Sequence, residues 1–244
     1  MLGRLYIGTS GWHYKHWLGL YYPQELPTHE MLSFYANDFD TVEINNTFYH
    51  LPAASTFDNW RTTTQKQFVF AVKGSRFITH MKKLKDPRSA TANFFAGAER
   101  LDRKLGPILF QLPPRWRVNL ERLESFLAAL PKEHRYSFEF RDPSWEIAEV
   151  FELLRNHQAA FCIHDLGGKQ TPLELTADFT YVRFHGPGEA KYAGSYSTRA
   201  LKKWAERIRE WQKKLARVYI YFNNDVGGHA VNNAKKLKEL IQST

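Results

Sequence analysis

Eight short hydrophobic runs, each ending on polar and often charged residues, constrain the fold of this chain more than any other feature of its sequence. They cover residues 5–10, 41–45, 68–73, 108–112, 136–141, 160–165, 181–186 and 218–225. Apolar residues recur at helical spacing over residues 94–105, 120–130, 147–154, 201–215 and 234–241. Alternating strands and helices form parallel sheets with right-handed connections. The pattern therefore predicts an α/β fold, a single TIM-type (β/α)8 barrel with a closed parallel sheet over residues 1–244.

The segments between the runs give more local expectations. Residues 30–37 and 55–64 predict shorter helices, and Asn119 is placed to cap the helix that follows it. Residues 166–180 leave room for about two helical turns. The connections over residues 11–27, 74–89 and 186–198 are long and follow the first, third and seventh strands. In a TIM barrel such connections lie over the face that carries the active site.

Composition narrows the class of protein. Of the 244 residues 43% are hydrophobic, which suffices for a large core, yet no stretch approaches the roughly 20 apolar residues of a membrane span. The first run begins at Leu5, which leaves no room for a signal peptide, and the single cysteine, Cys162, fits a reducing compartment. We therefore expect a cytoplasmic protein without a membrane partner.

The charge balance is basic, with 34 Lys and Arg against 25 Asp and Glu and a formal net charge of +9. Such an excess attracts anions and supports nucleic-acid binding. Much of it is local, because residues 199–217 hold eight basic side chains and two acidic ones. We interpret this segment first as the solvated face of a helix.

Side chains alternate across a strand, so each run can be sorted into two faces. In the fifth run Phe138 and Phe140 share one face, while Glu139 and Arg141 share the other. The charged pair is expected to point into the barrel, because the outer face packs against helices. The same rule predicts an inward set near the strand ends, made up of Ser10, Glu43, Asn45, Lys73, Gln111, Glu139, Arg141, His164, Arg183, His185 and Asn223.

This lining differs from that of ordinary barrels, whose interiors are filled with branched apolar side chains. Buried charges are costly unless they are paired or face a wet cavity. One interpretation is a structural network of internal salt bridges, such as Glu43 or Glu139 with Arg183. Because the charges gather at one end of the strands, we favour a functional site in which some members are paired.

Three kinds of chemistry fit such a lining. Glu43 and Glu139 invite a glycosidase interpretation, but they lie on the second and fifth strands, roughly across the barrel, among cations that would depress both acidities. A metal site would draw on Glu139, His164, Asp165 and His185, as in barrel phosphodiesterases. The cations Lys73, Arg141 and Arg183 repel a metal ion and favour an anion instead.

The loops after the last two strands support an anion site. They contain Gly186, Gly188, Gly194, Gly227 and Gly228, which allow backbone N–H groups to approach a phosphate, although flexible turns explain them equally well. Aromatic residues after strands are candidates for stacking on a ring, and these are Trp12, Tyr14, Tyr49, Trp145, Tyr192 and Tyr196.

Several ordered motifs also resemble a known family. They are IGTSGW from Ile7, YYP from Tyr21, TVEINNTFY from Thr41, FAVKGSRFITH from Phe70, GPILFQLPP from Gly106, FEFRDPSW from Phe138, YVRFHG from Tyr181 and YFNND from Tyr221. Over nearly the whole chain, the sequence resembles the YecE-like family, domain of unknown function 72. The resemblance implies a cytoplasmic TIM-type barrel and brings no established reaction. It also raises Asn223 and Asp225 as site candidates.

The leading hypothesis is an enzyme with hydrolase or lyase-type chemistry on a small anionic, ring-bearing substrate, such as a nucleotide or sugar phosphate. Catalysis is assigned to Glu43, Glu139, Arg183 and His185. Substrate binding is assigned to Ser10, Trp12, Asn45, Tyr49, Lys73, Gln111, Arg141, Trp145, His164, Tyr192, Tyr196, Asn223, Asn224 and Asp225. No cofactor is expected. The alternatives are a nucleic-acid-binding protein and a metal-dependent phosphodiesterase of endonuclease type.

Overall fold

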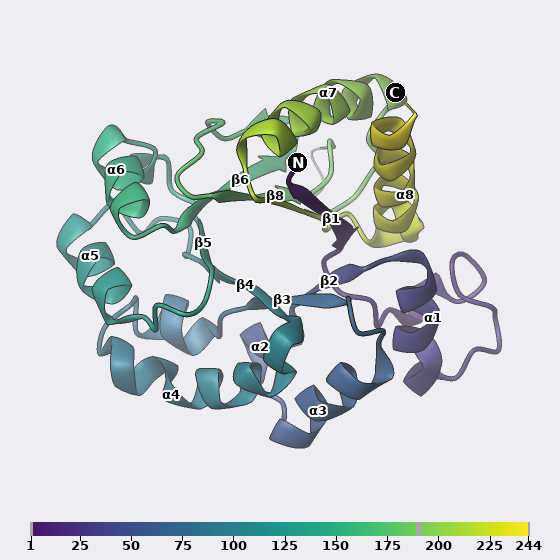
Figure 1. Cartoon of the computed structure of the whole chain (residues 1–244), viewed down its shortest axis with the longest axis horizontal. Coiled ribbons are helices and arrows are strands. Elements are labelled where there is room, and N and C mark those ends of the chain that lie inside the picture. Colours follow the sequence, from purple (N-terminus) through teal and green to yellow (C-terminus); the bar gives the residue numbers. More distant parts are fainter. Residues whose placement is uncertain (1, 189–191, 244) are drawn as a thin grey trace. The chain divides into compact units, whose positions relative to one another are not determined.

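The parallel strands of the chain form one sheet in the order that a TIM-type barrel requires. The computed structural model describes residues 2–188 and 192–243. Hydrogen bonds join the strands in the order β1-β9-β8-β6-β5-β4-β3-β2, and a parallel bridge pairs Ser10 after β1 with Glu43 of β2. The predicted α/β barrel fold is confirmed (Figure 1).

Each of the eight predicted runs is a strand. Their bounds are β1 (Arg4–Thr9), β2 (Thr41–Ile44), β3 (Val69–Lys73), β4 (Leu105–Gln111), β5 (Tyr136–Glu139), β6 (Ala160–Leu166), β8 (Phe179–Phe184) and β9 (Arg217–Phe222). The helices are α1 (Met31–Asp38), α2 (Asn46–Tyr49), α3 (Ala54–Thr63), α4 (Pro87–Ala98), α5 (Leu120–Ala129), α6 (Ala148–Asn156), α7 (Thr198–Lys214) and α8 (His229–Gln242). Asn119 caps α5 as expected, because its Oδ1 accepts a hydrogen bond from the Arg122 N–H at 2.8 Å.

The chain divides into two compact units. Unit 1 consists of Met1–Glu43, Ile163–Thr171 and Asp178–Thr244, and unit 2 of Ile44–Cys162 and Pro172–Ala177. The expectation that residues 1–244 form one domain stays a prediction.

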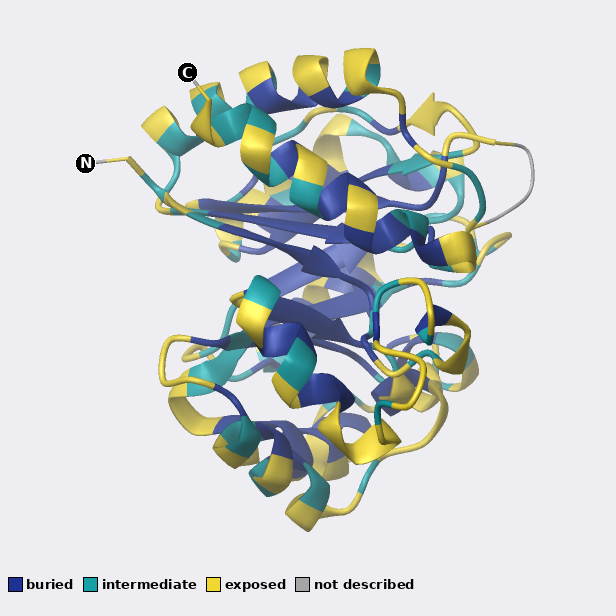
Figure 2. Ribbon diagram, turned by 90° about the vertical axis from the view of Figure 1, so that its right-hand side faces the viewer, coloured by how far each residue is buried: buried dark blue, intermediate teal, exposed yellow. Residues whose placement is uncertain are grey.

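In unit 1 the strand β9 lies between β1 and β8 and pairs in parallel with both. Leu5 lies opposite Val218 and Val182 opposite Ile220, so apolar residues form rows across these strands. The predicted apolar stripe of α7 is buried at Leu201, Trp204, Ile208 and Trp211, while Lys202 and Lys203 are exposed. The basic segment is therefore the solvated face of a helix, as expected. Figure 2 shows the same division between buried strands and exposed helix faces.

In unit 2 the strands β3, β4 and β5 pair in sequence, and β5 pairs with the start of β6. Aromatic rings fill the layer between this sheet and its helices. Phe110 lies 5.0 Å from Phe126 of α5 and 5.5 Å from Phe138 of β5, measured between ring centroids. All three side chains are fully buried.

Two connections differ from the expectation. Residues 166–180 contain a short strand, β7 (Lys169–Gln170), antiparallel to β6, in place of helical turns. The reason is Gly167-Gly168, whose φ angles of +60° and +74° suit the two-residue turn of a hairpin. The stripe over residues 94–105 is α4 followed by a 3-10 helix, Glu99–Lys104, within which Asp102 leaves helical geometry at φ 52°. Among the described residues no helix is both long enough and apolar enough to cross a membrane.

Candidate functional site

Three of the predicted site residues of unit 1 meet in one buried cluster. Glu43 and Arg183 form an ion pair in which Arg183 Nη2 lies 2.7 Å from Glu43 Oε1. The hydroxyl of Ser10 donates to the same carboxylate oxygen and accepts from Arg183 Nη2 at 3.1 Å. Glu43 and Arg183 have no exposed surface. The expected pairing of Glu43 with Arg183 is therefore present, and the burial of both charges is compensated by direct contact.

Tyrosines complete this cluster. Tyr181 of β8 donates its hydroxyl proton to Glu43 Oε2 at 2.6 Å. Burial, followed by the nearby Glu43 carboxylate, raises the pKa of Tyr181 above its ordinary value, so this hydroxyl stays a proton donor. Both carboxylate oxygens of Glu43 thus accept hydrogen bonds. We call Ser10, Glu43, Tyr181 and Arg183 the charged floor of unit 1.

A second group gathers at the ends of β6, β8 and β9. The rings of His164 and His185 lie 5.8 Å apart at an interplanar angle of 74°. Asn223 Nδ2 lies 3.0 Å from His185 Nδ1. His185 is fully buried and His164 nearly so. The structure therefore brings three of the predicted residues, two of them ionisable, into one group, which we call the histidine cluster.

Asp165 lies on the face of β6 opposite to His164, as alternation along a strand predicts. The Tyr196 hydroxyl donates to Asp165 Oδ1 at 3.2 Å and accepts from the Gly186 N–H at 3.1 Å. Burial raises the pKa of the Asp165 carboxyl, and the hydrogen bond from Tyr196 opposes that shift. Asp165 therefore lies on the side of β6 where Tyr196 packs on the outward-facing Phe184.

The loop after β9 is held in place by hydrogen bonds to three other segments of unit 1. The backbone oxygen of Asp225 accepts from Trp17 Nε1 at 2.9 Å and from His16 Nε2 at 3.0 Å. Asn224 is fully buried and donates to Gly194 O and to Asn233 Oδ1. Burial raises the pKa of the Asp225 carboxyl. Asn224 therefore holds the loop after β8 against the start of α8.

The predicted rim aromatics of unit 1 differ in exposure. Tyr192 is exposed and its ring centroid lies 5.7 Å from that of His185. Trp12 and Tyr196 are buried, and Tyr196 packs on Phe184. Of these three, Tyr192 alone offers an exposed ring for stacking.

In unit 2 the predicted residue Lys73 contacts the short helix α2 through both its side chain and its backbone. Its Nζ lies 4.2 Å from the centroid of the Phe48 ring, and its backbone oxygen accepts from Thr47. Tyr49 beside it is exposed, whereas Asn45 and Gln111 are half-buried. Tyr49 thus exposes its ring, and its predicted role in stacking stays a prediction.

The other predicted residues of unit 2 lie on β5 and after it. Glu139 is fully buried and accepts from Arg141 Nε, so the second glutamate is also paired, with an arginine of its own segment. Trp145 has no exposed surface, because its ring stacks on Phe140 at 4.9 Å and its Nε1 donates to Trp116 O. Trp145 therefore exposes no ring face in this structure, and its assignment to substrate binding stays a prediction.

Comparison with known proteins decides the family. The family described as "Protein of unknown function DUF72" matches residues 6–244. This chain belongs to the DUF72 family. The resemblance predicted from the sequence motifs is confirmed.

Relatives agree with the DUF72 assignment. The chain is 26% identical to the UPF0759 protein YunF of Bacillus subtilis (strain 168) over an alignment 273 residues long. The alignment covers 97% of this chain and 94% of YunF. A DUF72 family protein of Thermotoga maritima MSB8 has a similar crystal structure, with a TM-score of 0.88, 32% identity and coverage of 98% and 99% of the two chains. One from Enterococcus faecalis V583, at 18% identity and a TM-score of 0.81 over 97% and 95%, shows the same fold.

The residues of the alternative metal-site interpretation, Glu139, His164, Asp165 and His185, are not among the groups of metal-binding type in the described part of this DUF72 protein. Among the described residues, the group of metal-binding type whose ligand atoms lie within 4.8 Å of one another is Glu99, Glu133 and His134. His134 Nε2 already contacts Glu99 Oε1 at 3.1 Å there.

Sequence reasoning did not assign Tyr181 or Asn233 to the site, because a tyrosine or an asparagine in a core pattern carries no functional signal by itself.

Proposed function

We propose that the protein is an enzyme that acts on a small anionic, ring-bearing substrate, such as a nucleotide or sugar phosphate, by acid–base chemistry of the hydrolase or lyase type. One observation carries the proposal. Histidines of two neighbouring strands, His164 and His185, meet at the carboxyl ends of β6 and β8, the end at which TIM-barrel enzymes carry their active sites.

His185 is the proposed acid–base group. With the Asn223 amide as placed, Nδ2 donates to Nδ1, so a neutral ring carries its proton on Nε2 and offers a hydrogen bond to an anion. An amide turned by 180° accepts from Nδ1–H and leaves Nε2 as a base. Asn223 therefore accommodates both states of a residue that takes and returns a proton.

The charged floor is proposed to support this chemistry without touching the substrate. Arg183 and Glu43 neutralise each other, so the floor supplies fixed dipoles in a dry environment. Ser10 and Tyr181 hold the orientation of the carboxylate. We assign Glu43, Arg183 and Ser10 as positioning residues.

The anion is proposed to bind the loops after β8 and β9. Gly186, Gly194, Gly227 and Gly228 have positive φ, which lets these loops turn tightly enough for backbone to approach a phosphate. The N–H groups of Gly186 and Gly228 already donate to Tyr196 Oη and Asp225 O. His164 and His185 add positive charge when protonated. In unit 2, Lys73 and Arg141 remain proposed contacts for anionic groups.

We propose the cytoplasm as the compartment of the protein. The single cysteine, Cys162, is a buried free thiol, which agrees with a reducing compartment.

A thermal-shift screen tests the proposal. Inorganic phosphate, nucleoside monophosphates and sugar phosphates are added to wild type, to His185→Gln and to His157→Gln, whose histidine lies after α6 at the opposite ends of the strands. A ligand at 100 times its Kd stabilises by about 2.7 kcal/mol, a shift of several degrees. We expect that shift in wild type and His157→Gln and its loss in His185→Gln. Equal shifts in all three proteins, or none in wild type, would contradict the proposal.

A further inference from the structure

Large hydrophobic side chains are exposed at the strand ends of unit 2. Tyr49 is 64% exposed after β2, and Phe77 and Met81 are 42% and 67% exposed after β3. Phe48 connects the two loops, because its ring centroid lies 5.0 Å from those of both Tyr49 and His80. The loops after β2 and β3 therefore present their apolar side chains together.

Hydrogen bonds extend this surface to the next two loops. Arg122 Nη1 donates to Lys83 O at 3.3 Å, which joins the loop after β3 to the start of α5. The Val118 N–H donates to Ser144 Oγ at 2.9 Å, which joins the loops after β4 and β5. We call residues 45–53, 74–86, 112–122 and 140–147 the unit 2 rim.

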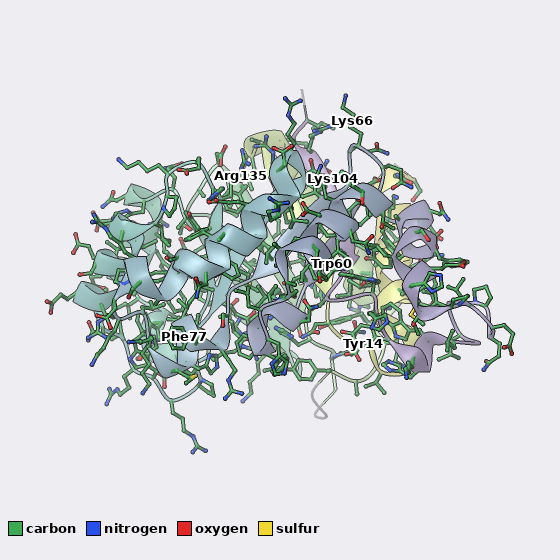
Figure 3. All side chains as sticks on the ribbon, turned by 90° about the horizontal axis from the view of Figure 1, so that it is seen from below. Tyr14, Trp60, Lys66, Phe77, Lys104 and Arg135 are labelled. Carbon is green, nitrogen blue, oxygen red and sulfur yellow. The ribbon has the colours of Figure 1, made fainter. Side chains whose placement is uncertain are left out.

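The unit 2 rim is basic. It contains eight Lys and Arg residues against four Asp and Glu residues. Cations and rings are interleaved within it, since Arg76 precedes Phe77 and Lys82 Nζ lies 5.8 Å from the Phe77 ring centroid. In Figure 3, Phe77 lies at the edge opposite to Lys66, Lys104 and Arg135 of the same unit.

The backbone fixes this presentation. Phe77–Met81 forms one turn of π-helix, a rare geometry that recurs at functional sites. Lys83 and Leu84 then adopt positive φ of 48° and 63°, and the fully buried Leu84 anchors the turn. Such backbone conformations persist where the surroundings enforce them. The backbone that carries the exposed side chains is thus fixed before any partner binds, which lowers the entropic cost of binding.

We propose that the unit 2 rim binds single-stranded nucleic acid. Exposed rings stack on unpaired bases and interleaved cations contact the phosphates, which is how sequence-tolerant single-strand binding works. In a duplex the base faces are stacked on one another, so a duplex would contact only the cations of the rim, through its phosphates. The basic face of α7 in unit 1 lacks exposed rings, because its aromatic residues Trp204 and Trp211 are buried. This inference does not depend on the proposed reaction at His185.

Fluorescence anisotropy with a labelled 12-mer of thymidine, measured across a salt series, tests the inference. Tyr49→Ala/Phe77→Ala removes stacking, and Arg76→Ala/Lys83→Ala/Arg115→Ala removes three charges. The matched control, Lys202→Ala/Lys203→Ala/Lys214→Ala, removes three charges from the exposed face of α7. All eight side chains are exposed, so the substitutions leave the core intact.

We expect the stacking variant to bind about 5- to 150-fold more weakly, the equivalent of one stacked base, with the same salt dependence. The rim charge variant should lower the slope of log K against log salt by about 0.7 for each phosphate that it no longer neutralises. The α7 control and His185→Gln should bind as wild type does.

Three results would overturn the inference. They are equal weakening in the α7 control and the rim charge variant, an unchanged Kd in the stacking variant, and equally tight binding of a 12-base-pair duplex or of an acidic peptide. Because His185→Gln is included, failure of this inference is distinguishable from failure of the proposed reaction.

Discussion

Arg183 Nη2 lies 2.7 Å from Glu43 Oε1, and both side chains are fully buried. This ion pair joins β8 to β2 within unit 1, and Ser10 and Tyr181 satisfy the remaining capacity of the carboxylate. A charged pair of this kind is stable because each charge is held by its partner. Removing either one leaves a charge buried without compensation.

Single substitutions of this pair should therefore be severe. Glu43→Gln or Arg183→Met is expected to lower the free energy of unfolding by about 3–5 kcal/mol, while the double variant loses less than the two single losses added together. Chemical denaturation measures all three. Lys213→Ala, which breaks the exposed pair with Glu210, is the control and should cost less than about 1 kcal/mol. Additive losses in the double variant would show that the two residues are not coupled.

Two glycines of the loop after β8 should differ sharply. At Gly186 φ is +99°, and an added Cβ would lie 2.3 Å from Ala193 O. Gly186→Ala is therefore expected to destabilise the protein by about 1–3 kcal/mol. At Gly188 the nearest atom would lie 3.9 Å away, so Gly188→Ala should change the melting temperature little. Equal melting temperatures for the two variants would contradict the loop geometry.

His80 should make unit 2 sensitive to acid. Burial, followed by the charges of Lys73 and Arg76, lowers the pKa of His80 to about 4. The unfolded chain has the ordinary histidine pKa of about 6.5, so it binds more protons than the folded chain between these values. The stability contribution of neutral His80 is present above pH 6.5 and is lost as the pH falls towards 4.

His80→Gln removes this difference in proton binding. Its melting temperature should fall less than that of wild type between pH 7 and about pH 4.5, where the folded and unfolded forms differ in charge. His50→Gln, at an exposed position of the same unit, is the matched control and should follow wild type. The same pH dependence in wild type and His80→Gln would show that His80 does not titrate as described.

The strands were predictable because each carries its own signal. Period-two alternation placed Glu139 and Arg141 on one face and Phe138 and Phe140 on the other, and the structure pairs the first two and stacks the rings of the second two. The partner of Arg183 could be narrowed to Glu43 or Glu139 but not decided. That choice depends on strand tilt and stagger, which a single strand does not encode.

The loops were less predictable because they have no period. Trp12, Trp145 and Tyr196 follow strands, as residues of an open rim would, yet tertiary contacts bury all three. The hairpin at Gly167-Gly168 did carry a signal, since two consecutive glycines suit a two-residue turn. Loop exposure depends on contacts between distant segments, and those become visible only in the folded structure.

Side-chain NMR of the histidines tests the central claim most directly. The pKa of the His185 ring is followed by pH titration with and without inorganic phosphate, with His157 as the internal control. An anion that binds beside His185 favours its protonated form, so we predict that phosphate raises the pKa of His185 and leaves that of His157 unchanged. A His185 pKa that phosphate does not move, or an equal change at His157, would contradict an anion site at the histidine cluster.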